Sequence, residues 1–254
     1  MWHVGVAGDP VAHSLSPALQ QLALDHLGLD GEAIRLHTTS LDDLSSFLAG
    51  TGQRALSITT PLKEAVVSLC DDIDGPSRVA GAVNSVLHHG GKVFGRNVDG
   101  EGLVQAVEAV TGRKAAGAQV LVLGGGGAAR SCVAALLAHG AEVTVATRRS
   151  LEVSEWNRGA RLTTEMSVGV STDWVINATS STLKGEGIDL VALDPQNALA
   201  IDLSYGHTSL FLEECAKKGW STLDGLPMLY FQAKLQLEWW FDQEIDIEVL
   251  GWQP

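Results

Sequence analysis

The chain has 254 residues, a length that fits two compact lobes. Of these residues 45% are hydrophobic and 19% are charged, and both values are typical of a globular protein. Its 17 basic and 30 acidic residues give a formal net charge of −13, which argues against nucleic acid as a partner because the surface as a whole repels phosphate. No segment has the roughly 20 consecutive apolar residues that span a bilayer. The first residues lack the features of a signal peptide, so we expect a cytoplasmic protein without a membrane partner.

Short β-branched runs alternate with amphipathic stretches, a pattern that predicts parallel sheets covered by helices. The predicted strands are residues 4–6, 55–59, 120–123, 142–146, 174–177 and 199–203. The predicted helices are residues 17–27, 62–70, 102–110, 128–138 and 209–218. In the tail that follows, we expect one helical stripe to pack on another lobe, formed by Met228, Gln232, Leu235 and Trp239.

The three cysteines, Cys70, Cys132 and Cys215, lie far apart in the sequence. This spacing argues against a disulfide framework and against a Cys-x-x-Cys metal site. We therefore expect reduced core residues and no bound metal.

A glycine turn joins the strand 120–123 to the helix 128–138, in the order that dinucleotide-binding folds use. Gly124 permits the tight turn and Gly126 lets the backbone approach a pyrophosphate, while free N–H groups at the start of the helix face the phosphates. The predicted cofactor-binding residues of this turn are Gly124, Gly125, Gly126, Gly127 and Ala128. A merely flexible turn is the alternative.

The strand 142–146 ends in Thr147, Arg148 and Arg149. An NAD site carries an acidic residue at this place for the ribose 2′-hydroxyl, whereas an NADP site uses arginine for the 2′-phosphate. Two arginines and no acidic residue follow the strand, so we predict NADP. The alternative is that both arginines are solvated loop residues.

Two hydroxyl pairs in the first hundred residues precede proline. Ser16 is predicted to cap the helix 17–27, and Ser14, which has no capping role in this interpretation, is the more diagnostic ligand for a carboxylate. Thr60 is predicted to cap the next helix, which leaves Thr59 on the other side of the strand to contact a ligand.

Lys63 is predicted to lie in the first turn of the helix 62–70, where a cation opposes the helix dipole and a purely structural role is less natural. Partial burial would make it a usable proton acceptor, although a solvated lysine is the commoner case. The structural alternatives are helix capping for Asp99 and a local turn for Asn84.

Seven motifs occur in a fixed order: Ser-x-Ser-Pro (14–17), Thr-x-Pro-x-Lys-Glu (59–64), Gly-Ala-Val-Asn (81–84), Asn-x-Asp-Gly (97–100), Gly-Gly-Gly-Gly-Ala-Ala-Arg (124–130), Asn-Ala-Thr-Ser (177–180) and Asp-Gly-Leu-Pro-Met-Leu (224–229). In this order, over nearly the whole chain, they resemble the shikimate dehydrogenase family. The resemblance implies an α/β fold with an N-terminal substrate lobe (1–99), a Rossmann-like NADP lobe (100–224) and C-terminal helices returning to the substrate lobe (225–254).

The resemblance also implies roles for individual residues. Ser14 and Ser16 resemble the hydroxyl pair that holds the substrate carboxylate, Tyr205 resembles the tyrosine that reaches the bound acid, and Lys63 resembles the catalytic lysine, paired with Asp99. The residues that resemble those gripping the ring hydroxyls are Thr59, Asn84, Asp99 and Gln232. Two further positions are placed at the NADP, Thr179 and Gly225.

The activity implied is the reversible reduction of 3-dehydroshikimate by NADPH to shikimate, on the route to aromatic amino acids, in a monomer or homodimer. Three residues depart from the family pattern: Ser57 replaces asparagine, Val98 replaces threonine and Thr147 replaces asparagine. Quinate or an amino analogue of shikimate is the alternative substrate, although Ser16 favours shikimate. The alternative from another class of protein is a non-catalytic NADPH sensor. The presence of both Lys63 and Asp99 argues against it.

Overall fold

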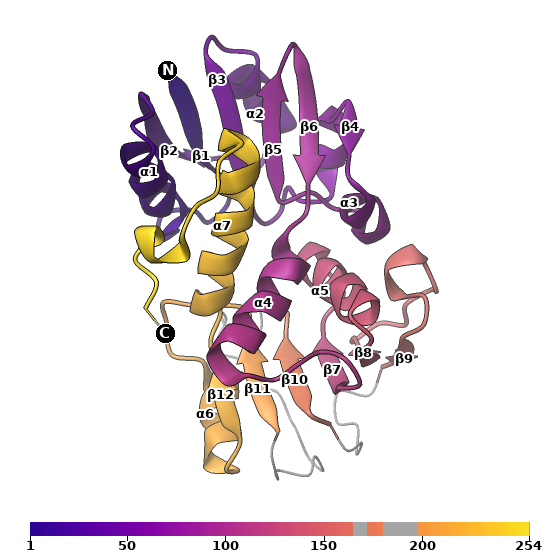
Figure 1. Ribbon diagram of the computed structural model, residues 1–254. Coiled ribbons are helices and arrows are strands. Elements are labelled where there is room, and N and C mark those ends of the chain that lie inside the picture. Colours follow the sequence, from indigo (N-terminus) through magenta and orange to yellow (C-terminus); the bar gives the residue numbers. More distant parts are fainter. Residues whose placement is uncertain (165–171, 180–197, 254) are drawn as a thin grey trace. The chain divides into compact units, whose positions relative to one another are not determined.

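The computed structural model describes residues 1–164, 172–179 and 198–253 (Figure 1). The chain divides into two compact units, one formed by residues 1–102 with 229–254 and the other by residues 103–228. Both divisions fall inside continuous helices, α4 (Asp99–Thr111) and α7 (Leu226–Phe241), a few residues from the boundaries given by the sequence. No polar linker marks either place, because helical hydrogen bonding runs through it.

The first unit is built on a six-stranded sheet in the order β2-β1-β3-β5-β6-β4. Its strands are β1 (Trp2–Gly8), β2 (Gly31–His37), β3 (Gln53–Ile58), β4 (Asp72–Ile73), β5 (Ser85–His89) and β6 (Lys92–Arg96). β1 runs parallel to β2 and β3, whereas β5 runs antiparallel to β3 and β6. The expectation of parallel sheets alone is therefore wrong for this unit. The hairpin between β5 and β6 turns at Gly90 and Gly91, whose positive φ angles of 59° and 76° suit a tight turn.

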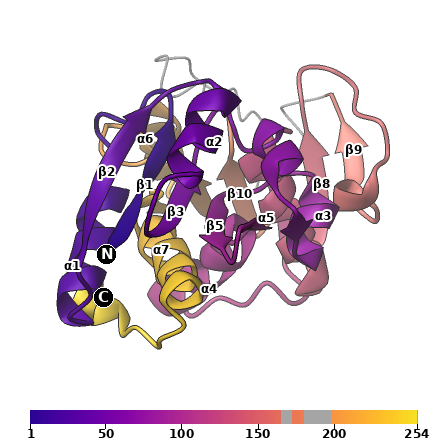
Figure 2. The same ribbon diagram turned by 90° about the horizontal axis from the view of Figure 1, so that it is seen from above.

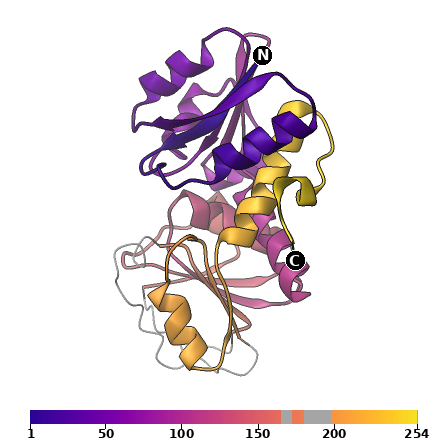
Figure 3. The ribbon, with the colours of Figure 1, turned by 90° about the vertical axis from the view of Figure 1, so that its left-hand side faces the viewer.

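Helices cover both faces of this sheet. Figure 3 shows α1 (Ser16–His26) and α7 on one side and α2 (Leu41–Leu48) on the other. The α2 side buries an apolar cluster that includes Leu44, Leu56 and Ile58. A short helix, α3 (Gly75–Ala80), connects β4 to β5. None of the described helices is long and apolar enough to cross a membrane.

Two predicted helical features of the first unit need correction. Residues 62–70 form only a short 3-10 turn, η1 (Ala65–Leu69), rather than an α-helix. In α7 the predicted stripe is half right, because Met228 and Gln232 are buried but Leu235 and Trp239 are partly exposed. The helix instead continues its buried face along two adjacent rows of residues four apart, Gln232, Gln236 and Trp240 in one and Ala233 and Leu237 in the other.

The second unit contains a sheet in which every strand runs parallel to its neighbours, in the order β12-β11-β10-β7-β8-β9 (Figure 1). Figure 2 shows β8 and β9 next to each other in this sheet. The strands are β7 (Gln119–Leu123), β8 (Glu142–Ala146), β9 (Arg161–Thr163), β10 (Trp174–Asn177), β11 (Leu199–Asp202) and β12 (Ser221–Leu223). Numbered within this unit, the order is 6-5-4-1-2-3, which is the order of the Rossmann dinucleotide-binding fold. The switch point of this topology lies between β7 and β10.

Helix α5 (Gly127–Ala138) follows β7, and α6 (Leu210–Lys217) lies between β11 and β12. Short 3-10 helices also occur, η2 (Glu155–Asn157) in this unit and η4 (Ile247–Leu250) in the first. α6 packs Phe211 and Cys215 into a cluster with Leu121 and Leu123 of β7. All three cysteines of the chain are free, and burial raises the pKa of Cys215 to about 12 and that of Cys70 to about 11. These two thiols therefore stay protonated near neutral pH.

Candidate active site

A lysine and an aspartate meet in the first unit, largely withdrawn from water. Lys63 Nζ donates to Asp99 Oδ2 at 2.5 Å, and the two side chains are 16% and 6% exposed. Asn84 Nδ2 donates to the other carboxylate oxygen, Asp99 Oδ1, at 2.8 Å. Asn84 Oδ1 in turn accepts the N–H of Val98 at 3.0 Å, which fixes the orientation of the amide. A lysine ammonium has three N–H donors, and the ion pair uses one of them.

Three separate segments bring these side chains together. Lys63 lies in the turn that follows β3, where its carbonyl accepts the N–H of Val83 at 2.7 Å, next to Asn84. Asp99 is the first residue of α4. The helix-dipole reasoning for Lys63 is wrong because no α-helix begins there. The alternative of a local turn ordered by Asn84 does not hold, since its side chain bonds Asp99 and Val98, which are distant in sequence.

The start of α1 differs from the prediction. Ser16 is not the N-cap; the cap position is Leu15, and Ser16 is the first helical residue. The hydroxyl of Ser14 accepts the N–H of Ser16 at 3.3 Å, so Ser14 has the local role that the sequence assigned to Ser16. Proline is tolerated at either of the first two helical positions, so Pro17 is compatible with a helix that begins at Ser16, one residue earlier than predicted. The Ser14 carbonyl also accepts a bond from Arg35 Nη2 at 2.9 Å.

Helix α7 adds Gln232 to the group around Asp99. Gln232 Oε1 lies 3.5 Å from Asn84 Nδ2, and its Nε2 donates to the Leu229 carbonyl at 2.9 Å. α4 approaches α7 very closely here, because a Cβ on Gly102 would lie 2.7 Å from Gln232 Cβ. Lys63, Asp99, Asn84 and Gln232 thus form one group. Thr59 is partly exposed at the end of β3.

The predicted cofactor residues gather at the carboxyl ends of the second sheet. Gly124 has a φ of +117°, and a Cβ there would lie 3.0 Å from the Ala178 carbonyl, next to Thr179. This places the turn at the switch point between β7 and β10, where ligands of such sheets bind. A Cβ on Gly125 would lie 3.4 Å from Thr147 Cγ2, whereas one on Gly126 would meet nothing within 4 Å. The backbone at Gly126 therefore leaves room for a phosphate.

Positive charge surrounds this turn. Arg148 and Arg149 are exposed after β8, and the Thr147 hydroxyl donates to the Arg149 carbonyl at 2.5 Å. Arg130 was not predicted, yet its Nε donates to the Gly125 carbonyl at 3.2 Å and so holds a third cation beside the turn. The sequence signal was available, because Arg130 stands on the first turn of α5.

A buried aspartate shapes the loop after β11. Asp202 is fully buried and accepts bonds from Asn177 Nδ2 at 3.1 Å, Ser204 Oγ at 2.5 Å and Ser209 Oγ at 2.6 Å. These bonds fix the chain on both sides of Tyr205, which is partly exposed.

Gly225 supports the same loop from the other side. Its N–H donates to the Ser204 carbonyl at 2.9 Å, and a Cβ there would lie 2.2 Å from the Leu203 carbonyl. Only glycine allows this approach. Tyr205 and Gly225 belong to the second unit, whereas Lys63 belongs to the first.

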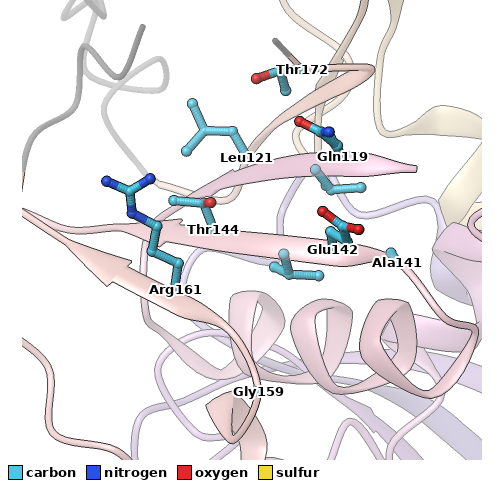
Figure 4. A pocket seen from close by; sticks show the side chains of 10 residues that line it. Gln119, Leu121, Ala141, Glu142, Thr144, Gly159, Arg161 and Thr172 are labelled. Atoms are coloured by element: carbon cyan, nitrogen blue, oxygen red, sulfur yellow. The ribbon is translucent and has the colours of Figure 1, made fainter. Parts of the chain in front are cut away.

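A pocket of about 390 Å³ lies elsewhere on the second sheet (Figure 4). It is lined by Gln119 and Glu142, the first residues of β7 and β8, together with Thr144 and Arg161. These amino ends are opposite to the carboxyl ends that carry the glycine turn. The pocket is therefore not the dinucleotide site.

The fold and these two groups of residues define a class of protein, a two-unit dehydrogenase with a dinucleotide-binding sheet and a lysine–aspartate pair. Residues 6–86 match the family model of the shikimate dehydrogenase substrate binding domain. The chain is 31% identical to shikimate dehydrogenase (NADP(+)) of Bacillus subtilis over 96% of this chain and 93% of that one. The chain belongs to the shikimate dehydrogenase family.

Solved structures agree with this assignment. Shikimate 5-dehydrogenase of Thermus thermophilus, in complex with NADP(H) and shikimate, superposes with a TM-score of 0.84 at 32% identity, covering 98% of this chain and 97% of that one. The ligand-free 5-ketofructose reductase of a Gluconobacter strain superposes with a TM-score of 0.80 at 28% identity, covering 98% and 96%. The scaffold therefore also occurs with a different named substrate.

Replacing Gly102 by Ala should displace Gln232, because the added Cβ would overlap the α7 backbone as well as the Gln232 side chain. Overpacking of this kind costs about 1–3 kcal/mol of the free energy of unfolding. Urea unfolding measures the loss. Gly75→Ala is the control, since a Cβ at Gly75 meets nothing within 4 Å, and an equal loss in both variants would contradict the close approach.

Proposed function

We propose that this protein is an NADP-dependent dehydrogenase that interconverts 3-dehydroshikimate and shikimate. The observation that carries the proposal is the Lys63–Asp99 pair, held by Asn84 within the unit that contains the substrate-binding family match. A protein that only senses NADPH has no need of a paired proton donor. The named activities of the relatives support the same conclusion.

The cofactor fits the residues at the switch point of the second sheet. The open backbone at Gly126 and the start of α5 would receive the pyrophosphate, and Arg148 with Arg149 would hold the ribose 2′-phosphate. When bound, NADPH supplies the hydride that reduces the ketone carbon. Thr179 and Gly225 complete this proposed cofactor site.

The proton is the task of the first unit. Lys63 donates it from Nζ to the ketone oxygen in reduction and accepts it from the hydroxyl in oxidation, while Asp99 orients the ammonium group. Asn84, Gln232 and Thr59 hold the ring hydroxyls in this proposal. The start of α1 receives the substrate carboxylate through the Ser14 and Ser16 hydroxyls, where the N–H groups of the helix also favour negative charge. Tyr205 corresponds in this proposal to the tyrosine that, in the family the chain resembles, reaches the bound acid.

The three free thiols, of which Cys132 and Cys215 are buried and Cys70 is partly exposed, fit a reducing compartment, so we also propose a cytoplasmic location. Quinate remains a second candidate acid. The 5-ketofructose reductase on the same scaffold makes an uncharged polyol ketone a third candidate, which would make no use of a carboxylate site. The chain is a monomer or a homodimer in this proposal, and light scattering distinguishes the two.

Replacing Lys63 by Ala should lower kcat for NADP-dependent oxidation of shikimate by about 10²–10⁴-fold with a smaller change in KM, because the proton is transferred in the transition state. The near-ultraviolet absorbance of NADPH measures turnover. The substrate is identified separately, by assaying the unchanged protein with shikimate and NADP, with quinate and NADP, and with 5-ketofructose and NADPH. Lys92→Ala, at an exposed lysine of the same unit, is the control. Near-normal turnover by Lys63→Ala would exclude the proposed role.

Replacing Arg148 by Gln should raise KM for NADPH by about 10- to 100-fold and leave KM for NADH unchanged, because only the 2′-phosphate is lost as a partner. Steady-state kinetics with both cofactors check this result. Arg158→Gln changes an exposed arginine of the same unit outside the proposed site and should alter neither value. Preference for NADH in the unchanged protein would overturn the assignment of both arginines.

A further inference from the structure

Three polar side chains lie buried between the first sheet and the helices α1 and α7. They are Gln20, Ser57 and Gln236, which are 2%, 6% and 2% exposed, and they are called the buried network below. Gln20 Nε2 donates to the Gly5 carbonyl and to Ser57 Oγ, both at 3.0 Å. Ser57 Oγ donates to Gln236 Oε1 at 2.6 Å, and Gln236 Nε2 donates to the Asn84 carbonyl at 3.1 Å. The bonds from Gln20 through Ser57 and Gln236 therefore run in one direction, from α1 to Asn84.

The two ends of the buried network meet the two ends of the proposed substrate site. Gln20 stands four residues after Ser16, on the same buried face of α1. At the other end, the Asn84 carbonyl accepts Gln236, while the Asn84 side chain holds Asp99 and hence Lys63. Ser57 is the middle residue, because its one hydroxyl both accepts from Gln20 and donates to Gln236.

Such a network gives little net stability but is costly to interrupt, since an unpaired buried polar group loses its hydration without compensation. Two buried glutamines on apolar helix faces would be replaceable by leucine if packing were their only role. Their bonds instead fix the distance between α1 and the segment that carries Asn84.

We propose that Gln20, Ser57 and Gln236 are positioning residues that set the span between the carboxylate-binding start of α1 and the Lys63–Asp99 pair. This inference rests on the proposed function. The buried network does not touch the reacting atoms. It sets the distance between the start of α1, which receives the carboxylate, and the Lys63–Asp99 pair, which receives the hydroxyl, so that one acid fits both. The kcat/KM of a substrate that has both a carboxylate and a ring hydroxyl should therefore depend on the network. The kcat/KM of a substrate that has only the ring hydroxyls should not.

Ser57→Ala opens the buried network at its middle. We expect kcat/KM for shikimate to fall about tenfold, mainly through KM, because one buried hydrogen-bonded link is lost. The same measurement is made with the ring triol that lacks the carboxylate. For this analogue the unchanged protein and Ser57→Ala should have equal kcat/KM.

Ser77→Ala is the matched control. Ser77 is fully buried in α3 of the same unit, and its hydroxyl has no hydrogen-bond partner among the described residues. Removing that hydroxyl should change neither substrate's kcat/KM.

Gln236→Met interrupts the next link with a side chain of similar size and should reproduce the loss for shikimate alone. The double variant should be no worse than either single variant, because one break already opens the network. The Gln236→Met single variant decides the matter if Ser57→Ala does not fold.

Equal losses for both substrates, or no loss for shikimate, would overturn the positioning role while leaving the proposed function intact. The proposed function fails separately, and only if the unchanged protein does not oxidise shikimate with NADP.

Discussion

The proposed chemistry depends on one ion pair, in which the ammonium of Lys63 and the carboxylate of Asp99 are both largely removed from water. Either charge alone would be costly in this place, because a buried ion without a partner loses its hydration. Asn84 donates to the second carboxylate oxygen, so each oxygen of Asp99 has a hydrogen-bond partner. The antiparallel strand β5 matters because Asn84 directly precedes it, and α7 matters because its Gln232 lies 3.5 Å from the Asn84 amide.

An acidic protein that handles an anionic acid and an anionic cofactor must provide attraction locally. With a net charge of −13, its long-range field repels both ligands. The proposed cofactor site offsets this repulsion with the local positive charge of three arginines near the glycine turn, Arg130, Arg148 and Arg149. The proposed carboxylate site uses hydroxyls and the N–H groups at the start of α1 instead, which are short-range donors.

The sequence predicted the second unit better than the first, and the reason is physical. A parallel sheet buried on both faces produces apolar runs that are easily recognised, so β7, β8, β10 and β11 were found, together with the glycine turn. Short strands such as β4 and the half-exposed β2 have no such signal. Lys63, Asp99, Asn84 and Gln232 were identified through family resemblance, and the structure brings them together. Gln20 and Gln236 were missed, because a glutamine becomes meaningful only when its buried partners are known.

The most direct test concerns Asp99, whose carboxylate joins the lysine to the rest of the site. The Asp99→Asn variant keeps the shape of the side chain but removes the counter-charge of Lys63. We predict that its kcat/KM for the oxidation of shikimate by NADP falls by about 10²-fold or more, while its affinity for NADPH is unchanged. A variant that oxidises shikimate at nearly the normal rate would contradict the proposed role of the ion pair.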